Sequence, residues 1–232
     1  HLSIRRQRQM CIRDRSHAMA PGATLYFYYD NDVTGCGASA LWTFTGMIAA
    51  AARTLSDNLV QTWSMSWGCS EDQCWTSGAR SSLDSNLAAM VGVGMTGFVA
   101  SGDWGAYATG DKWTLNVQFP QSDPYVVSVG GTTLLINNDG SYASESGVWN
   151  GGWGTTGWGG GGGNSVVFSR PSWQSTASGV TGLGRGGPDV AMEMDFHYPI
   201  YYGGSVSSGW GGTSFGAPEW NGYFASLSLI HI

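Results

Sequence analysis

Charged residues are scarce in this sequence, and lysine is almost absent. Asp, Glu, Lys and Arg make up 11% of the 232 residues, against about 25% in typical soluble domains. Five of the ten basic residues are arginines within the first 15 positions, so residues 16–232 carry five basic and fifteen acidic side chains, a formal net charge of −10. This acidic body argues against a nucleic-acid partner. It suits a secreted protein that works at low pH, where protonation relieves the repulsion between carboxylates.

Long apolar segments are also missing. No stretch approaches the roughly 18 consecutive apolar residues of a membrane-spanning helix, so we expect no membrane segment. The first 15 residues lack the apolar centre of a secretory signal peptide, and their composition differs from that of the remaining chain. Residues 1–15 and 228–232 resemble translated sequencing adapters. We therefore expect both ends to be foreign to the native protein, and residues 16–227 to form one domain.

Cysteine is rare as well. Of the four cysteines, Cys11 lies in the arginine-rich start, and Cys69 and Cys74 bracket four residues. The latter two could close a small disulfide loop, which leaves Cys36 without a partner. A zinc site is the alternative, although no second pair of ligands lies nearby in the sequence.

Alternating strand-like and helix-like segments predict an α/β fold with a doubly wound, mostly parallel sheet and helices on both faces, incomplete at both ends. Strands are predicted at residues 24–29, 60–67, 97–100, 125–129 and 133–136, and helices at residues 38–53 and 82–93. Gly130-Gly131 is read as a turn between the last two strands. Residues 147–164, rich in tryptophan and glycine, are predicted to form a loop that lies over the domain.

Near the C-terminus a glycine-rich turn, Gly211–Pro218, precedes an apolar run of helical length. A serine at the start of a helix lies in a field that favours developing negative charge, which makes Ser214 a candidate nucleophile. Pro218 suits the first helical turn, where the N–H that proline lacks is not needed. Helix capping by a Ser or Thr beside glycine is the simpler alternative.

Three segments, at residues 97–105, 119–134 and 188–218, resemble the sedolisins, which are serine-carboxyl peptidases with a subtilisin-like fold. Three shorter segments resemble the same family: residues 20–23, 64–68 and 168–174. The match runs in order from about residue 17 to residue 227. Because six motifs occur in the family's order, chance is a poor explanation for the resemblance.

The resemblance implies roles for individual residues. Ser214 would attack the peptide carbonyl and form an acyl-enzyme, and Asp103 would face the oxyanion. A carboxyl donates a hydrogen bond to an oxyanion only while it is protonated, so the enzyme would work in acid. The substrate main chain would lie along the strand ends that carry Ser66, Trp67, Gly68, Ser101 and Gly102. Without the family, Asp103 reads as a turn residue and Trp67 as a core residue.

The resemblance also implies groups that this sequence does not supply. The family's general base is a glutamate backed by an aspartate four residues later, and the corresponding positions here are Arg8 and Ile12. Asp14 lies two positions out of register and is not assigned. The family's calcium ligands lie downstream of the nucleophile, and no residue of this chain is assigned to calcium. Asp189, Glu193 and Asp195 are read as strand and turn residues, so no metal ligands are predicted.

The expected protein is therefore a secreted, acid-acting serine-carboxyl endopeptidase that cleaves protein or peptide substrates. It is expected to be a monomer, truncated and inactive as given. One alternative is a histidine-dependent subtilisin-like peptidase that uses His17 or His197 as base. Another is a non-catalytic module whose tryptophan-rich loop binds sugars or peptides, which predicts exposed, coplanar tryptophans and no cleft at Ser214.

Overall fold

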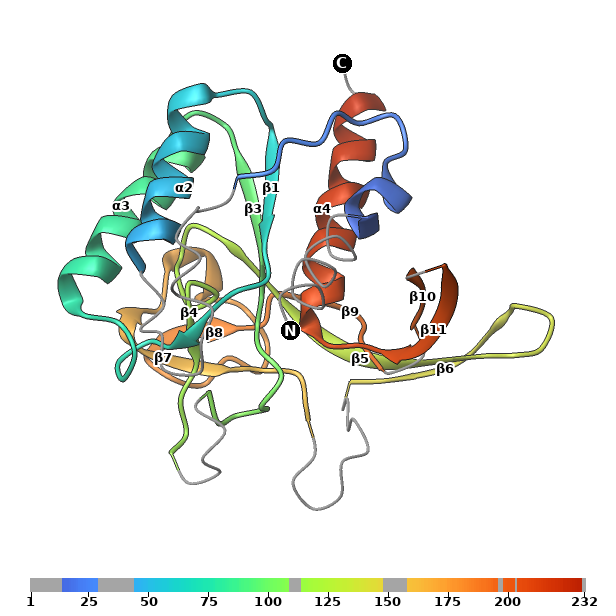
Figure 1. Cartoon of the computed structure of the whole chain (residues 1–232). Helices are drawn as coiled ribbons and strands as arrows, with labels where there is room; N and C mark the ends of the chain where they lie inside the picture. The colour runs from blue at the N-terminus through green and yellow to red at the C-terminus, as the bar shows by residue number, and fades with distance from the viewer. Residues whose placement is uncertain are drawn as a thin grey trace.

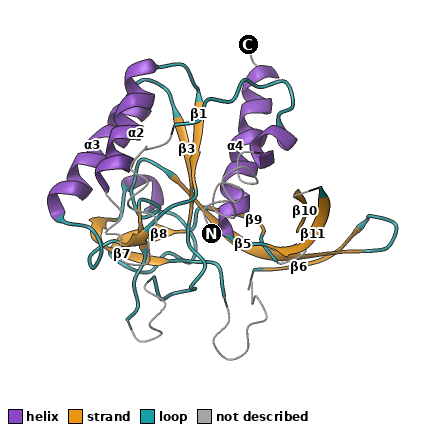
Figure 2. Cartoon of the chain, viewed as in Figure 1, coloured by secondary structure: helices purple, strands orange, loops and turns teal. Residues whose placement is uncertain are grey.

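The fold is a central sheet with helices on both faces (Figures 1 and 2). The computed structural model describes residues 14–28, 44–108, 114–147, 158–195, 198–202 and 204–230. The sheet contains four parallel strands, which are β1 (Thr62–Met65), β3 (Thr96–Ala100), β5 (Val127–Ile136) and β9 (Val190–Glu193). β6 (Tyr142–Ser146) pairs antiparallel with the second half of β5. The mostly parallel sheet predicted from the sequence is confirmed.

One face of the sheet is covered by α2 (Phe44–Asp57) and α3 (Ser77–Gly92). Leu83 and Leu87 of α3 share one helical face because they are four residues apart. Both are fully buried in a cluster with Val99 of β3 and with Phe119. α3 begins at a threonine cap, where the Thr76 hydroxyl accepts a hydrogen bond from Ala79 N at 3.2 Å.

The opposite face is covered by α4 (Thr213–Ile230). Ala217 of this helix packs against Phe98, Ala100, Val129 and Met194, all buried. Phe98 and Ala100 therefore point to one side of β3 and Val99 to the other, as alternation along a strand requires. Helices on both faces, the second feature of the predicted fold, are confirmed.

Three short antiparallel pairs flank the sheet. They are β2 (Cys69–Ser70) with β4 (Gln118–Phe119), β7 (Gly163–Ser169) with β8 (Gly184–Gly187), and β10 (Tyr198–Tyr202) with β11 (Ser205–Trp210). A single turn of 3₁₀ helix, η3 (Ser172–Gln174), lies between β7 and β8. β2 begins directly after the segment at Ser66–Gly68.

Two predictions about the strands are wrong. Residues 24–28 form no strand, and Leu25, Tyr26 and Phe27 are 40–53% exposed. Gly130-Gly131 is not a turn, because β5 continues through both glycines. A Cβ on Gly130 would lie 2.5 Å from Pro188 Cγ, so the small residue permits close packing of the next strand rather than a reversal of the chain.

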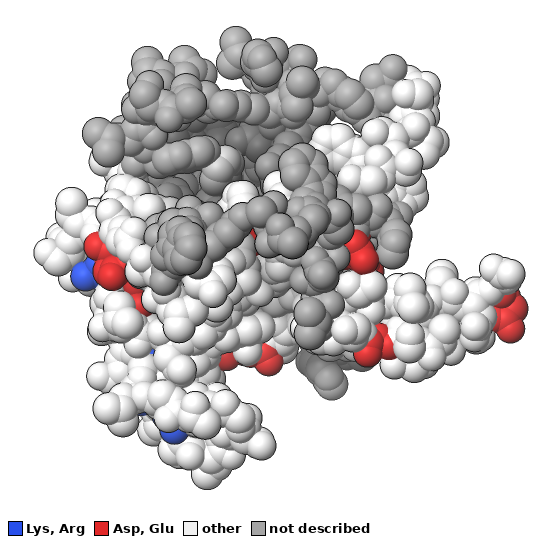
Figure 3. Space-filling view, turned by 90° about the horizontal axis from the view of Figure 1, so that it is seen from below, with Lys and Arg blue, Asp and Glu red and all other residues white. Residues whose placement is uncertain are grey.

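The helix predicted at residues 38–53 begins later. Its described part runs from Phe44 to Asp57 as α2, and residues 38–43 lie outside the described residues. None of the described helices is long and apolar enough to cross a membrane. On the face shown in Figure 3, most described atoms are uncharged and the acidic side chains form small separate groups. The scarcity of charge in the sequence is thus visible on this surface.

Candidate active site

The ends of two neighbouring strands bring the predicted substrate-binding segments together. β1 pairs with β3 up to Met65, which lies opposite Val99. Residues 66–68 follow β1, and residues 101–103 follow β3. Open α/β sheets place their ligands at this carboxyl edge of the parallel strands. The two segments therefore lie where a ligand site is expected.

The Asp103 carboxylate is held against the turn that carries Ser214. Its Oδ1 accepts hydrogen bonds from the backbone N–H and from the hydroxyl of Thr213, both at 2.8 Å. The Thr213 hydroxyl in turn accepts one from Gly102 N at 3.1 Å. A Cβ on Gly212, where φ is 110°, would lie 2.9 Å from Asp103 Oδ2, so this position requires glycine. Asp103 and Ser214 thus belong to one compact cluster.

Ser214 is the second residue of α4 and is 7% exposed. The backbone N–H groups at a helix start carry a partial positive charge, which stabilises negative charge developing nearby. Pro218 lies inside α4, not in its first turn as the sequence indicated. Because proline has no N–H, the Ser214 carbonyl lacks its usual helical partner four residues later. The Ser66 hydroxyl donates to this carbonyl at 3.0 Å instead.

The hydrogen bond from Ser66 to the Ser214 carbonyl indicates that Ser66 stabilises the fold, in addition to its predicted role in substrate binding. We expect Ser66→Ala to lower the free energy of unfolding by about 1–3 kcal/mol, because it leaves the Ser214 carbonyl without a donor. Urea denaturation would measure the loss. Ser82→Ala is the matched control, since the Ser82 hydroxyl donates to a carbonyl on an exposed stretch of α3, where water can replace it. Equal stability of the two variants would contradict the assignment.

A glycine segment lies alongside Asp103, and sequence reasoning did not assign it a place in the site. Gly159 N donates to Asp103 O at 3.0 Å, and Gly161 N donates to Gly102 O at 2.7 Å. A Cβ on Gly161 would lie 2.1 Å from Ser101 O. The run of consecutive glycines was the available signal, because such a run permits close approach of two backbones. The rest of the predicted loop at residues 147–164 lies largely outside the described residues.

Gln118 lies between the two predicted binding segments and was also missed. A Cβ on Gly102 would lie 2.7 Å from Gln118 Oε1, and one on Gly68 would lie 3.3 Å from the same atom. Gln118 Nε2 donates to Ala108 O at 3.2 Å. The carboxamide therefore fills the space under both segments. Nothing in the sequence around Gln118 indicated this position, because β4 is only two residues long.

The remaining predicted binding residues differ in exposure. Trp67 is 44% exposed, so it is not the core residue that the alternative interpretation required. Ser101 is buried at the end of β3, and its hydroxyl has no hydrogen-bond partner among the described residues. A single tryptophan of the predicted loop, Trp158, is described, and its ring packs on Trp104 with centroids 5.5 Å apart and planes tilted by 32°. This pair is not coplanar.

Cys69 and Cys74 are free thiols in this structure, and they lie side by side. The hydrogen bond between them and burial raise the pKa of Cys69. The same hydrogen bond lowers the pKa of Cys74 to about 7. The predicted disulfide is thus not formed here, although the two side chains are adjacent. It stays a prediction for the oxidised protein.

None of the described residues is assigned as the general base. Arg8 and Ile12 lie outside them, and His197 does too. His17 is exposed on a short helix at residues 14–19. Within the described ranges, no three His, Cys, Asp or Glu side chains are placed to hold a metal ion. No described residue is assigned to calcium, and no step below involves calcium.

The three acidic residues before the nucleophile are engaged with protein groups. Asp189 Oδ2 accepts from Ser128 N at 2.8 Å. Glu193 Oε1 accepts from Asp195 N at 2.7 Å, and Asp195 Oδ2 lies 3.3 Å from the Thr133 hydroxyl that donates to it. These contacts agree with their interpretation as strand and turn residues.

A buried carboxyl on α4 is an unpredicted feature close to the site. Glu219 is 7% exposed, and burial raises its pKa. The Tyr198 hydroxyl lies 3.1 Å from Glu219 Oε2, and Arg15 Nη1 lies 3.9 Å from Glu219 Oε1. The Arg15 guanidinium also lies over the ring of Phe215, 5.0 Å from its centroid. Arg15, the last residue of the predicted foreign arm, is thus packed against the start of α4.

Comparisons with known proteins agree with this geometry. No family model matches the sequence. The chain is 36% identical to sedolisin of Pseudomonas sp. (strain 101) over 192 residues, which are 79% of this chain and 32% of the relative. It is 32% identical to kumamolisin of Bacillus sp. (strain MN-32) over 209 residues, which are 87% of this chain and 35% of the relative. The chain thus spans about a third of the length of these curated relatives.

A solved structure gives the same match. The chain is similar to Pseudomonas sedolisin, a serine-carboxyl proteinase complexed with two molecules of pseudo-iodotyrostatin, with a TM-score of 0.81 and 33% identity. The alignment covers 93% of this chain and 59% of that chain. Because sequence and structure identify the same relatives independently of any single motif, the chain belongs to the sedolisin family of serine-carboxyl peptidases and has its α/β, subtilisin-like fold.

Proposed function

We propose that the protein to which this chain belongs is a secreted endopeptidase that cleaves peptide bonds in acid through Ser214. The observation that carries the proposal is the contact of Asp103 with Thr213, both at its N–H and at its hydroxyl. This contact holds a carboxyl against Thr213, the residue before the candidate nucleophile, which supports the proposal. Protein or peptide substrates are proposed because the similar solved structure is that of a serine-carboxyl proteinase. A monomer is the expected state.

The chemistry follows from the two groups. The Ser214 oxygen would attack the peptide carbonyl carbon, and the carbonyl oxygen would become an oxyanion. Asp103 in its protonated form would donate a hydrogen bond to that oxyanion, while an ionised Asp103 would repel it. Collapse of the intermediate expels the amine and leaves an acyl-enzyme, which water hydrolyses. A further group must take the Ser214 proton, and no described residue is assigned to that role.

Hydrolysis of a fluorogenic peptide between pH 3 and pH 8 by the full-length protein to which this chain belongs tests the proposal, since the chain as given is expected to be inactive. We expect cleavage in acid that declines toward neutral pH, because a carboxyl can donate a hydrogen bond to the oxyanion only while it is protonated. A maximum near neutral pH would instead support the histidine-dependent alternative. Binding of peptides without any cleavage in acid would contradict the proposal and support the non-catalytic alternative.

Two substitutions of Asp103 distinguish the loss of its hydrogen-bond donor from the loss of its ionisable carboxyl. Asp103→Ala removes the donor, and we expect the cleavage rate in acid to fall roughly 100- to 1,000-fold. Asp103→Asn keeps a donor that does not depend on pH and an oxygen that can accept from Thr213, so we expect a smaller loss and a flatter decline toward neutral pH. The ratio of the two variants at pH 4 and pH 7 is the measurement. Equal rates for both variants would exclude hydrogen-bond donation by Asp103.

A further inference from the structure

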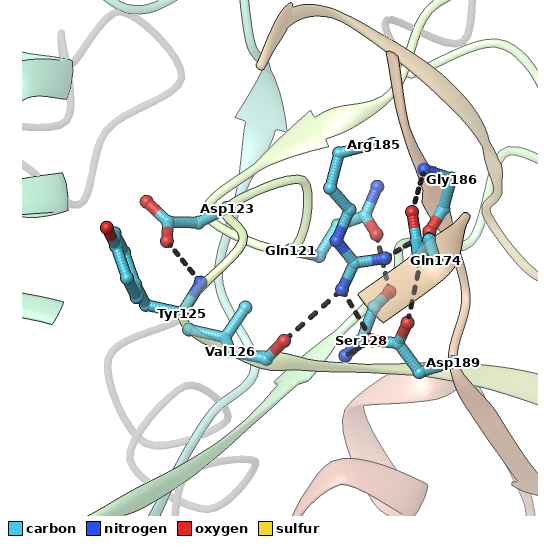
Figure 4. A network of polar contacts seen from close by, with 9 residues as sticks. All are labelled: Gln121, Asp123, Tyr125, Val126, Ser128, Gln174, Arg185, Gly186 and Asp189. Atoms are coloured by element: carbon cyan, nitrogen blue, oxygen red, sulfur yellow. Dashed lines mark hydrogen bonds and ion pairs between the residues drawn. The ribbon is translucent and has the colours of Figure 1, made fainter. Parts of the chain in front are cut away.

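A carboxyl outside the cluster of Asp103, Thr213 and Ser214 is buried without sufficient partners. Asp123 lies on the turn between β4 and β5 and is fully buried. Its Oδ1 accepts a hydrogen bond from Tyr125 N at 2.8 Å (Figure 4). Its Oδ2 is buried and has no hydrogen-bond donor in the described part of the chain. A carboxylate in this position would be costly, because one oxygen has lost its water without gaining a donor.

The charged groups that face Asp123 do not compensate for this burial. Asp84 approaches it from α3, and this second carboxyl favours the protonated form of Asp123. Arg185 approaches from β8 and favours the ionised form. The guanidinium is already committed elsewhere, since Arg185 Nη2 lies 2.5 Å from Asp189 Oδ2 and 3.2 Å from Val126 O (Figure 4). Arg185 therefore serves another carboxylate, Asp189.

We propose that Asp84 and Asp123 form a proton-sharing carboxyl pair that keeps the fold stable in acid and destabilises it as the pH rises toward neutral. One proton between the two carboxyls gives the buried oxygen of Asp123 the hydrogen bond that the protein does not otherwise provide. Removal of that proton leaves a buried negative charge beside a like charge. The pair is independent of the proposed peptidase activity, because neither residue lies in the active-site cluster.

The direction of the pH dependence follows from the pKa of Asp123. Burial, with a further contribution from Asp84, raises this pKa to about 8, while an aspartate in an unfolded chain has a pKa of about 4. Below about pH 4 both states are protonated, and the stabilisation is complete. Between about pH 4 and pH 8 the folded state holds a proton that the unfolded state has released, so stability falls as the pH rises. Above about pH 8 the contribution is lost.

The location of the pair gives this loss a structural consequence. The turn that carries Asp123 joins β4 to β5. β4 pairs with β2, where Phe119 lies opposite Cys69 immediately after Gly68. β5 pairs with β3 and β9 in the middle of the sheet. Ionisation of the pair would therefore weaken the connection between the edge of the active site and the centre of the sheet.

Urea denaturation of the full chain at pH 5 and pH 7 tests the proposal with Asp123→Asn, which keeps the size of the side chain and cannot ionise. We expect the unfolding equilibrium constant of the unsubstituted chain to rise between these two pH values by about 100-fold more than that of the variant. Asp84→Asn should also reduce the rise, because it removes the like charge. Asp139→Asn is the control, since Asp139 is an exposed carboxylate that accepts from Ser141, and its pH profile should match the unsubstituted chain.

Two results would overturn the proposal. The first is an unchanged pH profile in Asp123→Asn, or in Asp84→Asn if the former does not fold. The second is a stabilisation at pH 7 by Ca²⁺ alone that Asp123→Asn abolishes, because the pair would then hold a cation in place of a shared proton.

Discussion

In the full-length protein to which this chain belongs, Ser214→Ala is expected to lower the rate of peptide cleavage in acid roughly 1,000-fold or more, because the proposed acyl-enzyme forms on the Ser214 oxygen. The fold should remain intact, since the substitution keeps the start of α4 and removes a single oxygen. The measurement is the initial rate of fluorogenic peptide hydrolysis at pH 4, combined with circular dichroism at the same pH. A loss of activity with an unchanged spectrum would separate catalysis from folding.

Ser85→Ala provides the control for this experiment. Ser85 lies exposed on α3, where its hydroxyl donates to Ser81 O at 2.8 Å, so its removal should not affect the rate. A Ser214→Ala protein that retains a tenth or more of the activity would exclude Ser214 as nucleophile. The nucleophile would then have to be sought outside the cluster of Asp103 and Thr213.

The sequence predicts the parts of the site that depend on chain order, and less of what depends on contacts. The segments at Ser66 and Asp103 could be placed together because the carboxyl ends of parallel strands share one edge. The hydrogen bonds of Thr213 could not be predicted, since they join residues that are 110 positions apart. The contact of Ser66 could not be predicted either. Its hydroxyl replaces the N–H that Pro218 lacks by donating to the carbonyl of Ser214, which lies 148 positions later in the sequence.

The errors in the predicted fold have a common physical cause. Gly130-Gly131 and the aromatic residues at positions 24–28 have the local conformational tendencies that the sequence indicates. Tertiary contacts nevertheless decide which conformation these residues adopt. Gly130 permits the approach of Pro188 to a continuous strand. Residues 24–28 have strand-forming side chains, yet they have no partner strand among the described residues. A strand propensity without a partner strand does not produce a strand.

Arg185→Met is expected to lower the free energy of unfolding by about 3–5 kcal/mol, because it leaves Asp189 partly buried without its counter-ion. The Arg185 side chain is fully buried and lies 2.5 Å from Asp189 Oδ2, with a further contact to Trp173, whose ring centroid is 5.2 Å from the guanidinium carbon. Val126 O also loses its donor (Figure 4). Such a loss is a large part of the 5–15 kcal/mol that typically stabilises a domain. Urea denaturation at pH 5 would measure it.

The chain contains a matched control for this substitution. Arg53 and Asp57 form an ion pair with the same four-residue spacing and a distance of 2.8 Å, but the Arg53 side chain is 71% exposed. Water and salt screen this pair, so Arg53→Met should leave the denaturation midpoint unchanged within error. Arg185→Lys should give an intermediate loss, since lysine keeps the charge without the planar arrangement of donors. Similar midpoints for Arg185→Met and Arg53→Met would show that burial does not strengthen the Arg185–Asp189 pair.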